Sequence, residues 1–191
     1  MELTNIQKEK VQRENKILIS HATADKVYME LFVDLLETMR FPSNAIICSS
    51  IPGYGIPGGK KIYAWLKEQL LTCNLHVIFA LSENYYKSPA CLNEMGATWV
   101  TKSADTLFLL PNFKFESIKG CVDSTEVGIS IDSPDDELKY RLNELKNNLQ
   151  EEFSLEKIED IRWERARDKF ISEMREIGKK QENLTESSKS P

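Results

Sequence analysis

The stretch from Leu75 to Glu94 reads Leu-His-Val-Ile-Phe-Ala-Leu-Ser-Glu-Asn-Tyr-Tyr-Lys-Ser-Pro-Ala-Cys-Leu-Asn-Glu. Its first seven residues are almost entirely apolar, which is typical of a short strand buried on both faces. Ser88 and Pro89 then supply an N-cap and a first helical residue, and they predict a helix over residues 88–102. Glu94 therefore lies in the first turns of a helix that follows the carboxyl end of a buried strand. Ligands of α/β sheets bind outside the carboxyl ends of the strands, so Glu94 is a candidate for chemistry.

Short apolar runs alternate with amphipathic segments along the rest of the chain. The other predicted strands cover residues 16–20, 45–49 and 106–110, with a short fifth strand near residues 127–131. The other predicted helices cover residues 25–40, 60–72, 135–153 and 158–180, and the tryptophans on predicted helices (Trp65, Trp99 and Trp163) are expected in the core. This alternation predicts an α/β fold in which a parallel sheet has helices on both faces and a C-terminal helical extension.

Length, charge and cysteine spacing narrow the functional classes. A chain of 191 residues suits one domain, and its net charge of −5 without a basic stripe argues against a nucleic-acid partner. No apolar run is long enough to cross a bilayer, and the polar first 14 residues do not look like a signal peptide, so no membrane contact is expected. Four cysteines without a paired or zinc-like spacing predict reduced thiols, no metal site and a cytoplasmic protein.

Small hydroxyl residues and one imidazole follow the first three predicted strands. Ser20 and His21 end the first strand, Ser49 and Ser50 end the second, and Ser82 ends the third. In a parallel sheet these ends share one edge, close to the helix that carries the single carboxylate. Such an edge could hold ribose hydroxyls and phosphates, although serine at strand ends is also ordinary turn chemistry.

A loop rich in glycine and proline, from Ser50 to Gly59, follows the second strand. It matches neither the P-loop pattern, because Lys61 stands where serine or threonine would bind magnesium, nor the dinucleotide fingerprint. The composition favours an exposed loop that changes shape or docks a neighbouring molecule, and a long turn is the alternative.

Three motifs in this order resemble those of a Toll/interleukin-1 receptor (TIR) domain of bacterial type, over residues 16–112. The first is Ile17-Leu18-Ile19-Ser20-His21-Ala22 with Asp25-Lys26; the second is Ile46-Ile47-Cys48-Ser49-Ser50 with the loop Gly55-Ile56-Pro57-Gly58-Gly59; the third is the run 77–82 with Asn84-Tyr85, Ser88, Cys91 and Glu94. Each motif is weak alone, but three in order at suitable spacing are specific.

The resemblance implies a flavodoxin-like sheet of about five parallel strands and cleavage of the nicotinamide–ribose bond of NAD, with NAD as substrate and no bound cofactor. It implies that Glu94 is the catalytic glutamate. The residues expected to bind the substrate are Ser20, His21, Ala22, Thr23, Ser49, Ser50, Lys60, Ser82, Tyr85 and Ala90. Ala90 departs from the pattern, because many such enzymes carry tryptophan four residues before the glutamate. A platform for nicotinamide would then come from Tyr85, Tyr86 or a neighbouring chain.

One carboxylate is enough for this reaction. Nicotinamide leaves NAD as a neutral molecule, so the second carboxyl group that protonates the leaving group of an ordinary glycoside is not needed. An anion that stabilises the oxocarbenium-like transition state suffices. Water as the acceptor gives ADP-ribose, and an adenine nitrogen or a ribose hydroxyl gives a cyclic isomer.

Two functions compete for this chain, and one more is rejected. The first is a stand-alone TIR enzyme of Thoeris-type antiviral defence, which self-associates through loop 50–59 and signals to a separate effector protein. The second is a non-catalytic TIR adaptor or virulence factor that acts through TIR–TIR contacts. A phosphoacceptor receiver domain is rejected, because Ser82 stands where it needs aspartate. The expected organisation is a polar segment (1–14), a TIR domain (15–153), a C-terminal helix (154–182) and a disordered tail (183–191).

Overall fold

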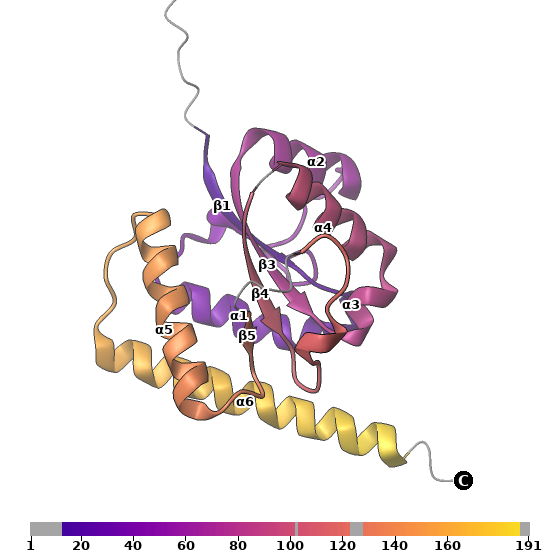
Figure 1. The fold of residues 1–191 in the computed structure, drawn as a ribbon. Coiled ribbons are helices and arrows are strands. Elements are labelled where there is room, and N and C mark those ends of the chain that lie inside the picture. Colours follow the sequence, from indigo (N-terminus) through magenta and orange to yellow (C-terminus); the bar gives the residue numbers. More distant parts are fainter. Residues whose placement is uncertain (1–12, 102, 123–127, 188–191) are drawn as a thin grey trace, which may run out of the picture.

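The computed structural model describes residues 13–101, 103–122 and 128–187, and its centre is a five-stranded sheet (Figure 1). The strands are β1 (Asn15–Ser20), β2 (Ile46–Ile47), β3 (Asn74–Leu81), β4 (Ala104–Leu109) and β5 (Ile129–Ser130). They lie in the order β2-β1-β3-β4-β5, and every pair is parallel. The predicted α/β class with a parallel sheet is confirmed, and the arrangement is consistent with a flavodoxin-like fold.

Helices cover both faces of the sheet, because the strands are apolar on both sides. Helices α1 (Lys26–Thr38), α5 (Asp135–Glu152) and α6 (Asp160–Ser187) share one core with Ile17, Ile19 and Ile78. Helices α2 (Ile62–Thr72), α3 (Glu83–Lys87) and α4 (Pro89–Thr101) share the other core with Leu18, Val77 and Phe79. Alternate residues of one strand thus serve different layers.

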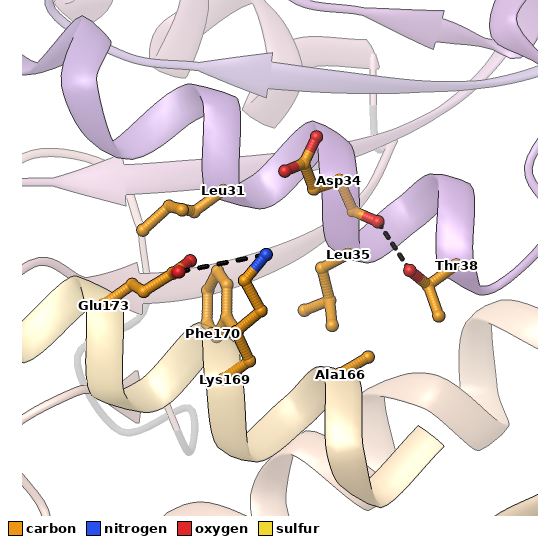
Figure 2. A pocket seen from close by; sticks show the side chains of 8 residues that line it. All are labelled: Leu31, Asp34, Leu35, Thr38, Ala166, Lys169, Phe170 and Glu173. Atoms are coloured by element: carbon orange, nitrogen blue, oxygen red, sulfur yellow. Dashed lines mark hydrogen bonds and ion pairs between the residues drawn. The ribbon is translucent and has the colours of Figure 1, made fainter. Parts of the chain in front are cut away.

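Helix α6 lies along α1 and closes the first core (Figure 1). Phe170 contacts Phe32 and Phe108 edge to face, with ring centroids 5.2 Å and 5.9 Å apart. A small cavity of ≈ 60 Å³ lies between the two helices. Leu31 and Leu35 face Ala166 and Phe170 there (Figure 2). A space of this size fits water rather than an organic ligand, so we assign it to packing.

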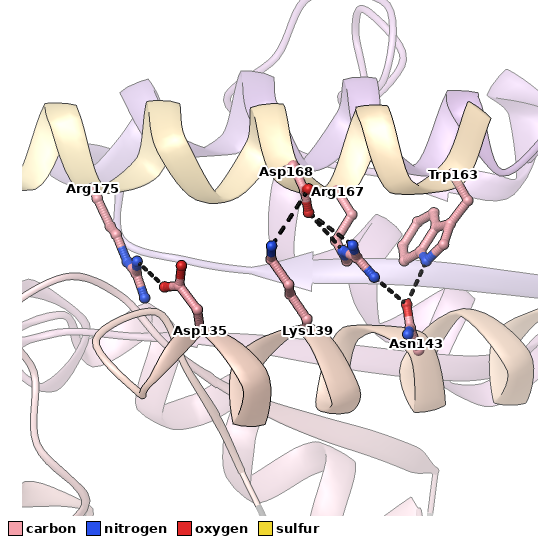
Figure 3. Close-up of polar contacts among 7 residues, drawn as sticks. All are labelled: Asp135, Lys139, Asn143, Trp163, Arg167, Asp168 and Arg175. Carbon is pink, nitrogen blue, oxygen red and sulfur yellow. Dashed lines mark hydrogen bonds and ion pairs between the residues drawn. The ribbon is translucent and has the colours of Figure 1, made fainter. Parts of the chain in front are cut away.

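Polar contacts join α5 to α6 (Figure 3). Asn143 accepts hydrogen bonds from the Trp163 indole at 2.6 Å and from Arg167 at 3.0 Å. Arg175 reaches Asp135 at 2.6 Å and also donates to the Ile131 carbonyl at 2.9 Å. These contacts satisfy the Asn143, Trp163 and Arg167 side chains at the contact between α5 and α6, which supports a structural role for the C-terminal extension.

Several sequence predictions differ from the structure in detail. Helix α3 was not predicted, because five residues are too few for a periodic pattern. Trp99 is 66 % exposed instead of lying in the core, whereas Trp65 and Trp163 are buried. Helix α6 continues to Ser187, so residues 183–187 of the predicted disordered tail are helical, and residues 188–191 lie outside the described part. The predicted fifth strand starts later than expected, and residue 127 is not described.

None of the helices described here combines the length and the apolar character that crossing a bilayer requires.

Candidate functional site

The carboxyl ends of β1 and β3 form the point where the chain reverses its direction of travel across the sheet. From β1 the chain crosses to β2 on one side, and it then returns to β3 on the other side of β1. A crevice at such a switch point is the usual ligand position in open α/β sheets. Ser20 is the last residue of β1 and His21 follows it, and their side chains contact two different groups of site residues.

Glu94 is the centre of the first group. Its carboxylate accepts a hydrogen bond of 2.6 Å from the Ser20 hydroxyl, across 74 positions of sequence. Burial raises the pKa of the Glu94 carboxyl above its usual value, and the Ser20 hydrogen bond opposes that shift. A half-buried carboxylate that keeps some exposure and has a perturbed pKa is typical of a functional group.

The Tyr85 side chain lies in the core next to the Glu94 group and does not face a ligand. Its side chain is 0 % exposed, so the expectation that it contacts substrate does not fit this structure. The phenol donates to the Cys91 carbonyl at 3.0 Å and lies 3.1 Å from the Ser20 hydroxyl. Tyr85 therefore fixes the position of Ser20 and, through it, of Glu94.

The Ser82 side chain caps the N-terminus of helix α3. Its hydroxyl donates to the buried Asp25 carboxylate at 2.5 Å and accepts from the Tyr85 backbone N–H at 2.9 Å. Asn84 adds a second hydrogen bond to Asp25, at 2.7 Å. These contacts join the start of α3 to the start of α1, so we assign Ser82 to the scaffold of the site. Asp25 belongs to the first motif, but its buried contacts could not be predicted from the sequence, because its partners are 57 and 59 residues away.

His21 and Ser50 form the second group. The two atoms His21 Nε2 and Ser50 Oγ are 2.7 Å apart, and His21 Nδ1 lies 2.9 Å from the Ile19 carbonyl. A carbonyl only accepts, so Nδ1 carries the proton. Burial lowers the pKa of His21, which favours the neutral imidazole. Nε2 is then an acceptor for the Ser50 hydroxyl. The sequence did not reveal this pair, because His21 and Ser50 belong to two separate motifs, 29 residues apart.

An open groove of ≈ 720 Å³ runs along the loop after β2. Three residues expected at the substrate site, Ser49, Ser50 and Lys60, line it together with the glycines of the loop. Gly53 and Gly59 have φ angles of 91° and 82°, which favour glycine and shape the loop. The Lys60 side chain is exposed, and its ammonium lies 3.7 Å from the Glu68 carboxylate. Because an ion pair at the surface is weak, the ammonium remains accessible to an anion.

The remaining residues expected at the substrate site are Ala22, Thr23 and Ala90. Ala22 is buried where β1 turns into the short 3₁₀ helix Thr23–Asp25, and Thr23 is exposed. Ala90 is half-buried one helical turn before Glu94. Tyr86 stacks on Phe113 with ring centroids 5.6 Å apart, so one face of its half-buried ring is covered.

Within the described residues, no group of three His, Cys, Asp or Glu side chains could hold a metal ion. The four cysteines are free, and Cys48, Cys73 and Cys91 are buried. The site thus offers one carboxylate, one neutral imidazole with its hydroxyl partner, and an open groove beside a lysine.

No family model matches this chain. The chain is similar to a protein of Bacillus subtilis (strain 168) called "Uncharacterized protein YddK", with 41% identity over 162 residues. The match covers 85% of this chain and 58% of that relative, so the chain spans somewhat more than half the length of the relative. The name of this relative assigns no activity.

Proposed function

We propose that this chain is a TIR-type enzyme that cleaves the nicotinamide–ribose bond of NAD. The observation that carries the proposal is the Glu94 carboxylate, half-buried at the switch point of a parallel sheet and held by Ser20 at 2.6 Å. The order of the three TIR-like motifs and the flavodoxin-like topology support it. The proposal extends to release of ADP-ribose or a cyclic isomer as a signal in antiviral defence, read by a separate effector protein.

Glu94 acts by stabilising positive charge. As the glycosidic bond breaks, its electron pair leaves with nicotinamide, and positive charge develops on the ribose. A carboxylate fixed beside the ribose stabilises that charge, and partial burial strengthens the effect because the local dielectric constant is lower than that of water. The same burial raises the pKa of Glu94, so the enzyme is active on the alkaline side of that pKa.

Self-association through loop 50–59 is part of the proposal. Half of the loop residues are exposed, the Tyr85 ring is buried, and Phe113 covers one face of the half-buried Tyr86 ring. A second copy could cover the crevice with its own loop or with an exposed aromatic side chain such as Tyr63 or Trp99. Specific activity is then expected to rise with protein concentration.

The structure selects the variant that tests this association. A Cβ atom added at Gly58 would meet nothing within 4 Å, so we expect Gly58→Arg to fold normally while it changes the exposed loop. At Gly55 the added atom would lie 3.3 Å from the Ser49 carbonyl oxygen, which makes Gly55→Arg the less clean variant. Gly58→Arg should abolish the concentration dependence of activity without changing the unfolding temperature.

The test of the proposed function is incubation of the purified chain with NAD over a wide range of protein concentration, with the products identified by mass spectrometry. Release of nicotinamide together with ADP-ribose or a cyclic isomer is expected. A chain that leaves NAD intact at every concentration, while it still self-associates, would favour the non-catalytic adaptor instead.

A further inference from the structure

The His21–Ser50 pair has a geometry that the cleavage step at Glu94 does not use. Ser50 is half-buried and lines the open groove, whereas His21 is only 8 % exposed. A molecule in the groove can therefore reach the Ser50 hydroxyl directly, and the imidazole is accessible mainly through that hydroxyl. The pair joins the Glu94 group through the peptide bond between Ser20 and His21.

We propose that Ser50 and His21 form a proton relay that activates the hydroxyl-bearing acceptor, water or a ribose hydroxyl, which captures the ribosyl cation. This inference rests on the proposed function. The acceptor oxygen forms a bond to the ribose C1′ atom and passes its proton to Ser50 Oγ. Ser50 gives its own proton to His21 Nε2. The positive charge of the ribosyl cation ends as an imidazolium, so atoms and charge balance.

Three features of the surroundings support this role. The Ile19 carbonyl holds the proton of Nδ1 and orients the ring, which leaves Nε2 facing the hydroxyl. Burial lowers the pKa of His21, so the base is neutral before the reaction, and the Asp25 carboxylate and the Ile19 carbonyl favour the imidazolium that forms. Cys48 lies 4.0 Å from Ser50 Oγ, but burial raises the pKa of its thiol to about 11, so it does not compete as an anion.

Nicotinamide exchange separates this step from bond cleavage. Labelled nicotinamide attacks the ribosyl cation through its ring nitrogen and re-forms NAD. That return needs no proton transfer, because the nitrogen carries no proton. Capture of water or of a ribose hydroxyl does release a proton. Loss of the relay should therefore slow net consumption of NAD and spare exchange.

The experiment measures label exchange and net product formation side by side for the full chain, Ser50→Ala and His21→Gln. General-base catalysis contributes about 10²–10⁴ in rate, so the ratio of exchange to product formation should rise at least about tenfold in both variants. Ser43→Ala, at an exposed serine before β2, is the matched control and should keep the original ratio. Thermal unfolding verifies that each variant is folded.

Three results would overturn the relay while the function stands. Exchange and product formation that fall by the same factor would make the pair structural, and rates that both stay at their original values would leave the acceptor without this base. An ADP-ribosyl adduct on Ser50 that accumulates and is not turned over would also contradict it, because Ser50 would then be the acceptor. Original protein that neither exchanges the label nor consumes NAD would overturn the proposed function, and the relay with it.

Discussion

Replacing Glu94 by glutamine removes one charge and almost nothing else. The side chain keeps its length, and the Ser20 hydroxyl can donate to the amide oxygen as it does to the carboxylate at 2.6 Å. Two unit charges 4 Å apart interact by about 4 kcal/mol at the effective dielectric constant of about 20 that suits a half-buried site. Since about 1.4 kcal/mol is a factor of ten in rate, Glu94→Gln should lower turnover by about 10³.

The fold should tolerate this change. Burial raises the pKa of Glu94, so folding favours the protonated form. The stability from that preference is present below the pKa of the unfolded chain and is lost as the pH rises through the folded pKa. At neutral pH the charged Glu94 carboxylate therefore destabilises the folded state, and glutamine removes this destabilisation. The unfolding temperature of Glu94→Gln should be equal to or higher than that of the original protein.

Nicotinamide release from NAD measures turnover, at one protein concentration above the onset of self-association. Glu83→Gln is the matched control, because it makes the same chemical change at an exposed position in the first turn of α3. It should leave the rate unchanged. The reasoning is refuted if Glu94→Gln releases nicotinamide as fast as the original protein, or if both variants lose activity equally.

Three further predictions concern pH dependence and packing. Activity should fall as the pH drops through the raised pKa of Glu94, hence at a pH above the ordinary glutamate value of about 4.3, and a pH profile of kcat/KM checks it. Gly178→Ala should destabilise the protein by about 1–3 kcal/mol in urea unfolding, because the new methyl group would overlap Pro111. Gly96→Ala is the contrasting variant inside α4. Its methyl group meets open space, so it should stabilise the protein by about 0.5–1 kcal/mol. Phe170→Ala should cost about 3–5 kcal/mol in the same assay, since its ring fills the core between α6 and the sheet, and a loss below about 1 kcal/mol would contradict that packing.

The alternation of apolar runs and amphipathic segments was enough to predict the fold class. A run such as Leu75 to Leu81 is short and almost entirely apolar, which is typical of a strand covered on both faces. Proline and serine at the start of α4 placed its boundary within one residue. Helix α4 also shows the limit. Its apolar residues occupy every side, with Cys91 and Met95 buried and Trp99 and Val100 exposed. A helix without an amphipathic pattern does not reveal which side packs.

The candidate site, like the fold, could be predicted from the sequence only in part. The sequence alone placed Glu94 near the end of a buried strand and small hydroxyl residues at the neighbouring strand ends. Only the tertiary structure decided that Ser20 binds Glu94 and that His21 binds Ser50, since these partners are 74 and 29 residues apart. It also moved Tyr85 from the expected site surface into the core. Local sequence patterns reveal the periodicity and composition of a segment. Hydrogen-bond partners at a sheet edge depend instead on strand order and on the direction in which each side chain leaves the backbone.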